Sequence, residues 1–263
     1  MADRDLRSEY KSDKVQEAKR IIDKAIEKNV VLKLIGGLAV RNHCEIIDFC
    51  ERDYSDIDMV GLSKHFEGIQ RVFAELGYVE NKDVLVESGG DRLQFITRDG
   101  REHIDVFMDK FDMDHDVIDL KERLNIEKYT ISLSDILLTK IQIHFLNEKD
   151  VRDILTLFKD CRLGERDEPG VLNLKYIAGK CADDWGLYYD ILVNIDKCLN
   201  LMDNYTISEG EKERIREGLL KLKQLIIDVP KTKKWLKRSK KRVKKPWWNI
   251  IEAEDREKIR DRV

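Results

Sequence analysis

The spacing of apolar side chains predicts alternating helices and strands over the first part of the chain. Residues 14–29 carry apolar side chains every three or four positions, which is typical of a helix with one buried face. Residues 30–35 form a short apolar run of the kind found in buried strands. A second helix is expected after Gly36-Gly37, beginning at about Leu38. The chain therefore opens as helix, strand and helix.

The same analysis predicts one more helix and a hairpin before residue 110. A third helix is expected over residues 63–76 and a strand over residues 78–86. Asp99-Gly100 lies between two apolar-rich runs within residues 93–108, and this dipeptide is a strong signal for a β-hairpin. These elements predict a small mixed β-sheet with helices packed on it.

The second half of the chain is expected to be helical. A polar linker at residues 164–170 interrupts the helical spacing. Helices are expected at residues 134–146, 151–158, 172–181, 184–202 and 208–227. The predicted fold class is therefore α+β, with a mixed β-sheet and packed helices followed by a helical C-terminal domain.

Composition favours a globular protein of the cytoplasm. Of the 263 residues, 42% are hydrophobic and 38% are charged, so the chain can bury a core while its surface is rich in charge. We find no run of the ~20 apolar residues that a membrane span needs, and the polar N-terminus predicts no secretory signal. The expected location is the cytoplasm, with no membrane partner.

Three aspartates are candidates for metal binding. Alternate side chains of a strand share a face, so Asp56 and Asp58 are expected to project together. Asp105 lies in the second strand of the hairpin and completes a triad if the two strands are neighbours. Carboxylates this close repel one another unless a cation compensates them, and oxygen ligands suit Mg²⁺. The turn Gly36-Gly37 would let the backbone approach a phosphate closely.

These motifs carry a family resemblance. Gly36-Gly37, then Ser55-Asp56-Ile57-Asp58, then Asp105 resemble the nucleotidyltransferase superfamily that includes DNA polymerase beta. The 18 residues between Gly37 and Asp56 exceed the commonest spacing of that superfamily. Longer spacings and a similar glycine motif occur in the branch of antibiotic nucleotidyltransferases and abortive-infection toxins.

The resemblance implies roles for individual residues. The three aspartates would hold two Mg²⁺ ions, and Asp105 would also accept a proton from the acceptor. Gly36 and Gly37 would hold the phosphates of a nucleoside triphosphate (NTP), and Ser55 would touch phosphate. Two downstream segments are similar to helical motifs of the same branch. In these motifs Lys140 would contact phosphate, and Asp150 and Asp153 would flank the site.

The resemblance also divides the chain and suggests an activity. Residues 1–129 would form the catalytic domain, residues 130–230 a helical domain lining the substrate cleft, and residues 231–263 a basic segment containing tryptophans. The implied reaction is transfer of a nucleoside monophosphate from an NTP to RNA or a small molecule, with release of pyrophosphate. Two alternatives are a non-catalytic module that binds RNA or a partner on the same fold, and a toxin-like enzyme with an antitoxin-like partner. His103 and His115 are further candidates for substrate contacts.

The basic segment carries a separate hypothesis. Residues 231–245, from Lys231 to Lys245, include ten Lys or Arg and no acid, so removing this charge of +10 from the net −3 leaves −13 on the rest of the chain. Such a run attracts polyanions, and Trp235, Trp247 and Trp248 could stack on unpaired bases. The alternative is that this segment packs on the acidic body of its own protein. The sequence leaves both interpretations open.

Overall fold

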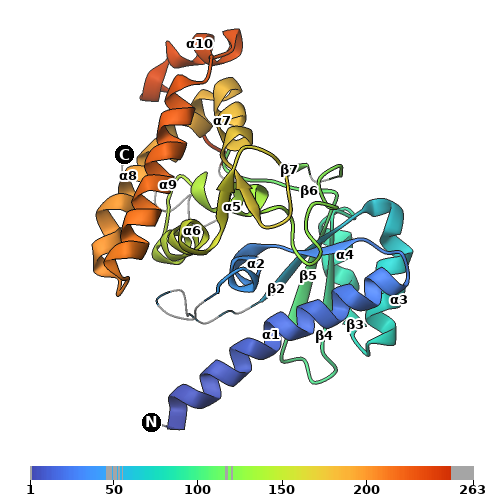
Figure 1. The fold of residues 1–263 in the computed structure, drawn as a ribbon. Helices are drawn as coiled ribbons and strands as arrows, with labels where there is room; N and C mark the ends of the chain where they lie inside the picture. Colours follow the sequence, from blue (N-terminus) through green and yellow to red (C-terminus); the bar gives the residue numbers. More distant parts are fainter. Residues whose placement is uncertain are drawn as a thin grey trace. The chain divides into compact units, whose positions relative to one another are not determined.

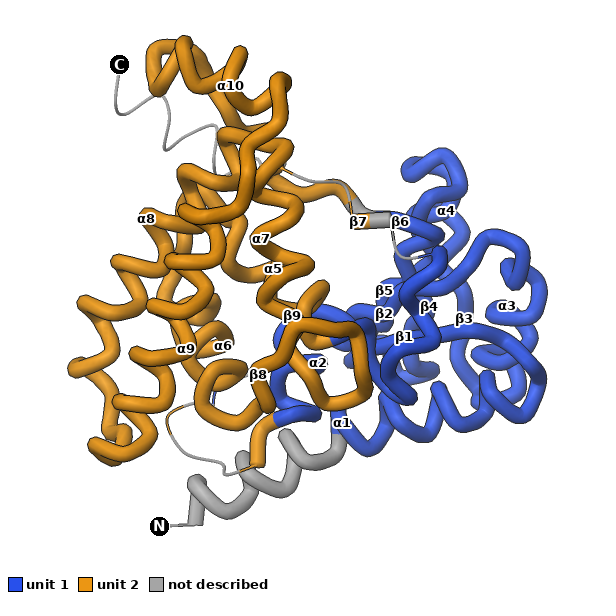
Figure 2. Tube along the Cα trace, turned by 45° about the horizontal axis from the view of Figure 1, so that its top comes forward, with its two compact units in different colours: residues 1–43, 51–111, 119–132 blue, residues 44–50, 112–118, 133–263 orange. Residues whose placement is uncertain are grey.

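The computed structural model of the chain describes residues 2–45, 49, 52, 54, 56–115, 118–119 and 121–249, with side chains described except at 2–13, 111 and 119. The chain forms two compact units (Figure 2). Unit 1 comprises residues 1–43, 51–111 and 119–132, and unit 2 comprises residues 44–50, 112–118 and 133–263. Among the described helices, none is long and apolar enough to cross a membrane. The domain boundaries predicted from the sequence stay a prediction.

Unit 1 is built on a five-stranded mixed sheet with the strand order β1-β2-β5-β4-β3 (Figure 1). The strands are β1 (Leu32–Leu34), β2 (Ile57–Gly61), β3 (Val79–Glu80), β4 (Arg92–Ile96) and β5 (His103–Met108). Strands β2 and β5 are parallel, whereas the other neighbouring pairs are antiparallel. This mixed sheet and its helices confirm the predicted α+β class, and the hairpin at Asp99-Gly100 is also confirmed.

Helices pack around this sheet, and the three longest of them bury apolar side chains. They are α1 (Ala2–Glu27), α2 (Gly36–Asn42), η1 (Ser63–His65), α3 (Phe66–Glu75) and α4 (Lys82–Glu87). Ile21 and Ile22 of α1 are fully buried, and Phe73 of α3 stacks on Phe95 of β4 with ring centroids 3.9 Å apart. The strand predicted over residues 78–86 was partly wrong. Asn81 ends β3 and caps α4 by accepting a hydrogen bond from the Asp83 amide, so the chain turns into a helix there.

Helices make up most of the described part of unit 2. They are α5 (Leu133–Ile141), α6 (Glu148–Asp160), α7 (Leu174–Asp183), α8 (Trp185–Leu201), η2 (Met202–Asn204), α9 (Glu209–Asp228), α10 (Lys233–Ser239) and η3 (Arg242–Lys244). Strands β8 (Arg162–Gly164) and β9 (Val171–Asn173) form a parallel pair, and the predicted linker forms the loop between them. Two short strands, β6 (Lys110–Phe111) and β7 (Ile118–Asp119), lie where the chain passes between the units. Helix α9 begins with a capping box between Ser208 and Glu211.

Candidate active site

The three predicted acids lie on adjacent strands of unit 1. Asp56 directly precedes β2, Asp58 lies within it, and the parallel register places Asp58 opposite Asp105 of β5. The alternation of the strand explains this arrangement, because Ile57 and Met59 are buried in the core and leave Asp56 and Asp58 to the other face. The sheet therefore supplies the neighbouring strands on which the predicted triad depends.

Asp105 is held by two side chains of β4. Its Oδ1 accepts hydrogen bonds from Arg92 Nε (2.9 Å) and Gln94 Nε2 (3.0 Å), and its Oδ2 lies 2.5 Å from Arg92 Nη2. The hydrogen bond to Asp105 holds the pKa of Arg92 above its ordinary value although burial opposes this, and the charges of Asp58 and Asp56 act in the same direction. Arg92 therefore offsets part of the negative charge of all three acids.

His103 connects two of the acids at the more exposed side of the cluster. Its Nε2 lies 3.1 Å from Asp56 Oδ1 and 3.9 Å from Asp105 Oδ2. The side chains of His103 and Asp56 are 45% and 36% exposed, whereas Asp105 is buried. The cluster therefore combines a buried, hydrogen-bonded carboxylate with groups that solvent and a ligand can reach.

The glycine turn lies against the second acid. Gly36 has a φ of +69°, and a Cβ atom there would be 3.0 Å from Asp58 Oδ2, so both the backbone conformation and the space call for glycine. A Cβ atom at Gly37 would collide with the Arg52 guanidinium. Helix α2 begins at Gly36 itself rather than near Leu38, and its N-cap, Ile35, provides no side-chain cap. Because the two glycines have no side chains, the backbone of the turn can lie directly against a carboxylate and a guanidinium.

Sequence analysis missed the two arginines of this cluster. The Arg52 guanidinium packs on Gly37 and lies 4.4 Å from the centre of the Tyr54 ring. No sequence signal identifies it, since the contact depends on how the loop returns to the glycine turn. Strand alternation could have identified Arg92 and Gln94. They are two residues apart on β4 and so share a face of the sheet, and the register places Gln94 opposite Asp105 of β5.

The donors fit one Mg²⁺ ion at Asp56 and Asp58. Carboxylate oxygens are suitable ligands, and Mg²⁺ usually binds through one or two carboxylates together with substrate phosphates. Gly36 lies close to this pair of acids, since a Cβ atom on it would be only 3.0 Å from Asp58 Oδ2. Within the described residues, no group of three or more His, Cys, Asp or Glu side chains is arranged to hold a metal ion. Asp105 is instead occupied by Arg92 and Gln94.

The other predicted site residues belong to unit 2 or lie outside the described residues. Lys140 Nζ lies 3.0 Å from Asp150 Oδ1 and 3.1 Å from Asp153 Oδ2, and the three side chains are 13%, 6% and 3% exposed. Burial lowers the pKa of Lys140, but the charges of Asp153 and Asp150 outweigh it and hold the pKa above its ordinary value. The fold thus brings these three residues together as a buried ion cluster. Ser55 lies outside the described residues.

The predicted substrate contact His115 is a core residue of unit 2. Its side chain is fully buried, and its Nε2 lies 2.7 Å from Asp190 Oδ2, which also lies 2.9 Å from His144 Nδ1. Trp247 Nε1 donates to both oxygens of Asp190 at 3.1 Å. Burial raises the pKa of Asp190, but hydrogen bonds from His115 and His144 outweigh it and keep the pKa below its ordinary value. This environment gives His115 a structural role.

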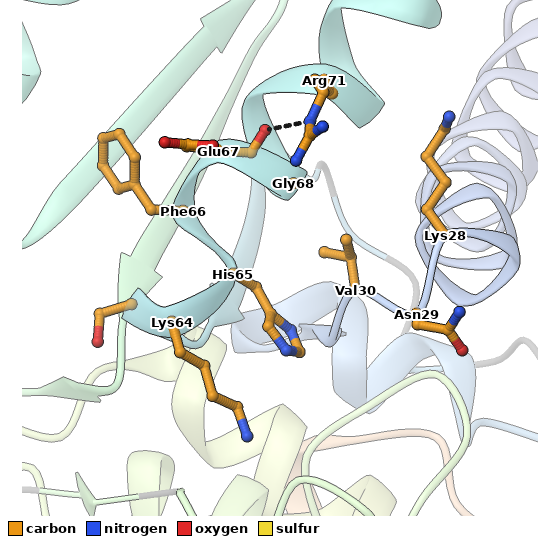
Figure 3. Close-up of a pocket in the computed structure, with 10 residues that line it drawn as sticks. Lys28, Asn29, Val30, Lys64, His65, Phe66, Glu67, Gly68 and Arg71 are labelled. Atoms are coloured by element: carbon orange, nitrogen blue, oxygen red, sulfur yellow. Dashed lines mark hydrogen bonds between the residues drawn. The ribbon is translucent and has the colours of Figure 1, made fainter.

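A separate cavity of about 670 Å³ lies in unit 1 between the end of α1 and the start of α3 (Figure 3). Lys28, Lys64, His65 and Arg71 lie around it, and none of the three aspartates lines it. Lys28 Nζ pairs with Glu75 at 2.6 Å, and Arg71 Nε donates to the Glu67 carbonyl. His65 Nδ1 accepts a hydrogen bond from the Val31 amide. These polar groups stabilise the local fold, so we assign the cavity no catalytic role.

Comparison with known proteins gives no family assignment, since no protein-family model matches the chain and neither does any curated protein. Functional inference therefore depends on the geometry of the site.

Proposed function

We propose that this protein is a metal-dependent nucleotidyltransferase. The observation that carries the proposal is the register of β2 and β5, which sets Asp58 beside Asp105 with Asp56 two residues away. The contact between Gly36 and Asp58 adds the glycine turn to the same cluster. Acids on neighbouring strands beside a turn of two glycines suit a metal-bound triphosphate. This proposal includes the nucleotidyltransferase-like fold of unit 1.

The residues of the cluster have separate roles in the proposed reaction. Asp56 and Asp58 would hold Mg²⁺, which when bound supplies positive charge against the triphosphate. The backbone at Gly36-Gly37 and the Arg52 guanidinium would hold the phosphate oxygens. The acceptor oxygen would form a bond to the α-phosphorus while the bond from that phosphorus to the β-phosphate oxygen breaks, and pyrophosphate would leave with the electron pair.

The proton of the acceptor needs a base. Asp105 was expected to take it, but both of its oxygens already interact with Arg92 or Gln94. His103 is more exposed and lies 3.1 Å from Asp56 Oδ1. We therefore assign proton acceptance to His103, and we assign to Asp105 the positioning of Arg92 and its charge. The acceptor, an RNA or a small molecule, and an antitoxin-like partner stay predictions.

The second candidate is a non-catalytic module that binds RNA or a partner on the same fold. The observation that favours it is the pairing of Asp105 with Arg92, because a guanidinium can replace a metal ion as the counter-charge. In that case the cluster would hold the sheet together and transfer would be absent. The two candidates differ in whether divalent ions and NTPs bind together at Asp56 and Asp58.

The test is incubation of the purified protein with each α-labelled NTP and Mg²⁺, alone, with total RNA, and with a panel of hydroxylated small molecules. We expect the wild type to transfer label. The Asp56→Ala/Asp58→Ala variant should transfer it at least 100-fold more slowly, since both proposed metal-binding carboxylates are gone. Asp112→Asn/Asp203→Asn removes the same charge at two exposed positions and should transfer label like the wild type.

Binding measurements separate the outcomes if no label is transferred. Mg²⁺-dependent NTP binding that the alanine variant loses would mean that the acceptor was missing from the panel. Absence of NTP binding by the wild type would contradict the enzyme proposal and favour the non-catalytic binding module.

A further inference from the structure

A cavity of about 470 Å³ lies in unit 2 between the start of α8, helix α10 and Trp247. This volume falls within the range of small-ligand pockets, which is about 300–1,000 Å³. Asp183 and Asp184 contribute to its lining, which also holds several cations and two indole rings. The residues that provide them are Trp185, Lys234, Lys237, Arg238, Lys241 and Trp247.

The cations come from one side of the cavity. Lys234 and Lys237 lie three residues apart on α10 and so share a face of that helix, and Lys241, just after its end, lines the same cavity. Lys234 Nζ pairs with Asp183 at 2.9 Å. Lys237 and Lys241 are exposed, and neither forms an ion pair with a residue that the structure describes. Among the described residues, these two ammonium groups at the rim are therefore available to an anionic ligand.

Arg238 forms a fixed wall of the cavity. Its guanidinium carbon lies 4.8 Å from the centre of the Trp185 ring. Its Nη1 donates to the Arg242 carbonyl at 2.9 Å and its Nη2 to the Lys245 carbonyl at 3.0 Å. These contacts hold the planar group in place before any ligand arrives, and a held guanidinium plane is a good stacking surface for a base.

Trp247 is equally well held. Its indole N–H donates to Asp190, and a Cβ atom at Gly186 would lie only 2.5 Å from the Trp247 carbonyl oxygen. The segment after α10 can therefore approach α8 closely because residue 186 is glycine. Trp247 is partly exposed as a residue and lines the cavity, and its ring also packs edge-on against Trp185 and Tyr189. The cavity thus has preformed planar walls, which lowers the entropic cost of binding a flat ligand.

We propose that this cavity binds one nucleotide of a single-stranded nucleic acid. The base would stack against the Arg238 and Trp247 wall, and the flanking phosphates would lie at Lys237 and Lys241. Stacking surfaces combined with a cationic groove are the usual means of binding unpaired strands. A duplex does not fit, because its bases are stacked on one another and cannot enter a cavity of this size. The inference concerns unit 2 alone and does not depend on the proposed transfer reaction.

A strand fits better than a free nucleotide because the cations continue beyond the cavity. Lys233, Lys240, Lys244 and Lys245 are exposed on the same segment. A polymer can neutralise several of these charges at once and release counterions from each phosphate, whereas a mononucleotide cannot. The length of the basic run thus favours an extended anion, one nucleotide of which lies in the cavity.

The test measures binding of fluorescently labelled 12-nucleotide single-stranded RNA and DNA by fluorescence anisotropy. A duplex and a free mononucleotide serve as competitors. The variants are Lys237→Ala/Lys241→Ala and the matched control Lys240→Ala/Lys244→Ala, which removes the same charge from the same run outside the cavity. We expect the cavity variant to lose at least tenfold in affinity and the control less than threefold. The slope of log affinity against log salt should fall by about 1.4 in the cavity variant, since each phosphate contact on a single strand contributes about 0.7.

Several results would overturn the inference. Equal losses in the two variants would show that the run binds anions without using the cavity, and so would a duplex that competes as well as a single strand. Lack of binding by the wild type, or mononucleotide binding as tight as the oligomer, would also contradict it. Asp56→Ala/Asp58→Ala should bind the strand like the wild type, so failure of the transfer proposal and failure of this one can be told apart. Thermal unfolding of each variant checks that the fold is intact.

Discussion

The two units each contain aspartates beside a basic side chain, but they compensate the charges in different ways. In unit 2, Lys140 lies between Asp150 and Asp153, and all three side chains are almost fully buried. In unit 1, Arg92 pairs with Asp105, while Asp56 and His103 remain open to solvent. The first cluster is closed and the second is open on one side.

This difference separates a stabilising cluster from a ligand-binding one. A buried ion cluster has its attraction offset by the cost of removing the charges from water, so its members depend strongly on one another. An open cluster of acids that solvent can reach can exchange its counter-charges for a bound cation at a lower cost than a buried one. We therefore expect changes in the Lys140 cluster to alter folding, and changes in the Arg92 cluster to alter binding.

The largest effect should come from Lys140→Met. Asp150 and Asp153 would then be buried without their counter-charge, and loss of one partner of a buried pair typically costs about 3–5 kcal/mol. Urea unfolding followed by circular dichroism measures the loss. The triple variant Lys140→Met/Asp150→Asn/Asp153→Asn removes the stranded charges and should recover much of it. A loss below about 1 kcal/mol in the single variant would show that the cluster is not closed.

A smaller loss of stability should follow when the pH is lowered, because of His43 in unit 1. Burial, assisted by the charge of Lys19, lowers the pKa of His43 to about 4. Its Nε2 lies 2.9 Å from Thr130 Oγ1, which itself donates to the Ile131 carbonyl. Thr130 Oγ1 therefore accepts a hydrogen bond from the Nε2–H of a neutral imidazole. His43 is a partly buried polar group whose loss of contact with water is compensated by a hydrogen bond rather than by an opposite charge.

The sign of the pH effect follows from this neutral state. As the pH falls below about 6.5, the unfolded chain binds a proton at His43 before the folded protein does. Stability should therefore fall from pH 6.5 to about pH 4, with a loss of about 2 kcal/mol at pH 5 relative to pH 8. His43→Gln keeps a donor for Thr130 and should lose about 2 kcal/mol less over the same interval. Parallel stability curves for the two proteins between pH 8 and pH 5 would contradict this assignment.

Much of the fold could be predicted because apolar spacing determines which face of an element is buried. The helix over residues 63–76 and the Asp99-Gly100 hairpin follow from such patterns, and the structure contains both. The strand over residues 78–86 was partly wrong since its apolar residues suit either element, and the cap at Asn81 decides for a helix. Local hydrogen bonding can therefore override a short ambiguous pattern.

The candidate site was predictable only where its residues are linked by strand alternation. Asp56 and Asp58 share a face because they are two residues apart. Asp105 lies on the second strand of the hairpin, β5, which pairs with β2 and places Asp105 opposite Asp58. The contact of Arg52 with Gly37 joins a loop to a turn across 14 intervening residues of sequence, so no local pattern shows it. Nor could the sequence show that Lys140 pairs with Asp150 and Asp153, since this depends on how α5 packs on α6.

The smallest change in stability, and the sharpest test of the open cluster, should come from Arg92→Gln. Arg92 is 38% exposed and Gln94 still donates to Asp105, so the cost in stability should be about 1 kcal/mol. Removal of the competing cation should strengthen Mn²⁺ or Mg²⁺ binding about tenfold, which corresponds to about 1.4 kcal/mol and is measurable by titration calorimetry. Arg98→Gln, at an exposed position of the same hairpin, is the matched control and should leave metal affinity unchanged. If Arg92→Gln binds the metal no more tightly than the control, Arg92 does not compete for the site. The acids of unit 1 would then resemble the closed cluster of unit 2.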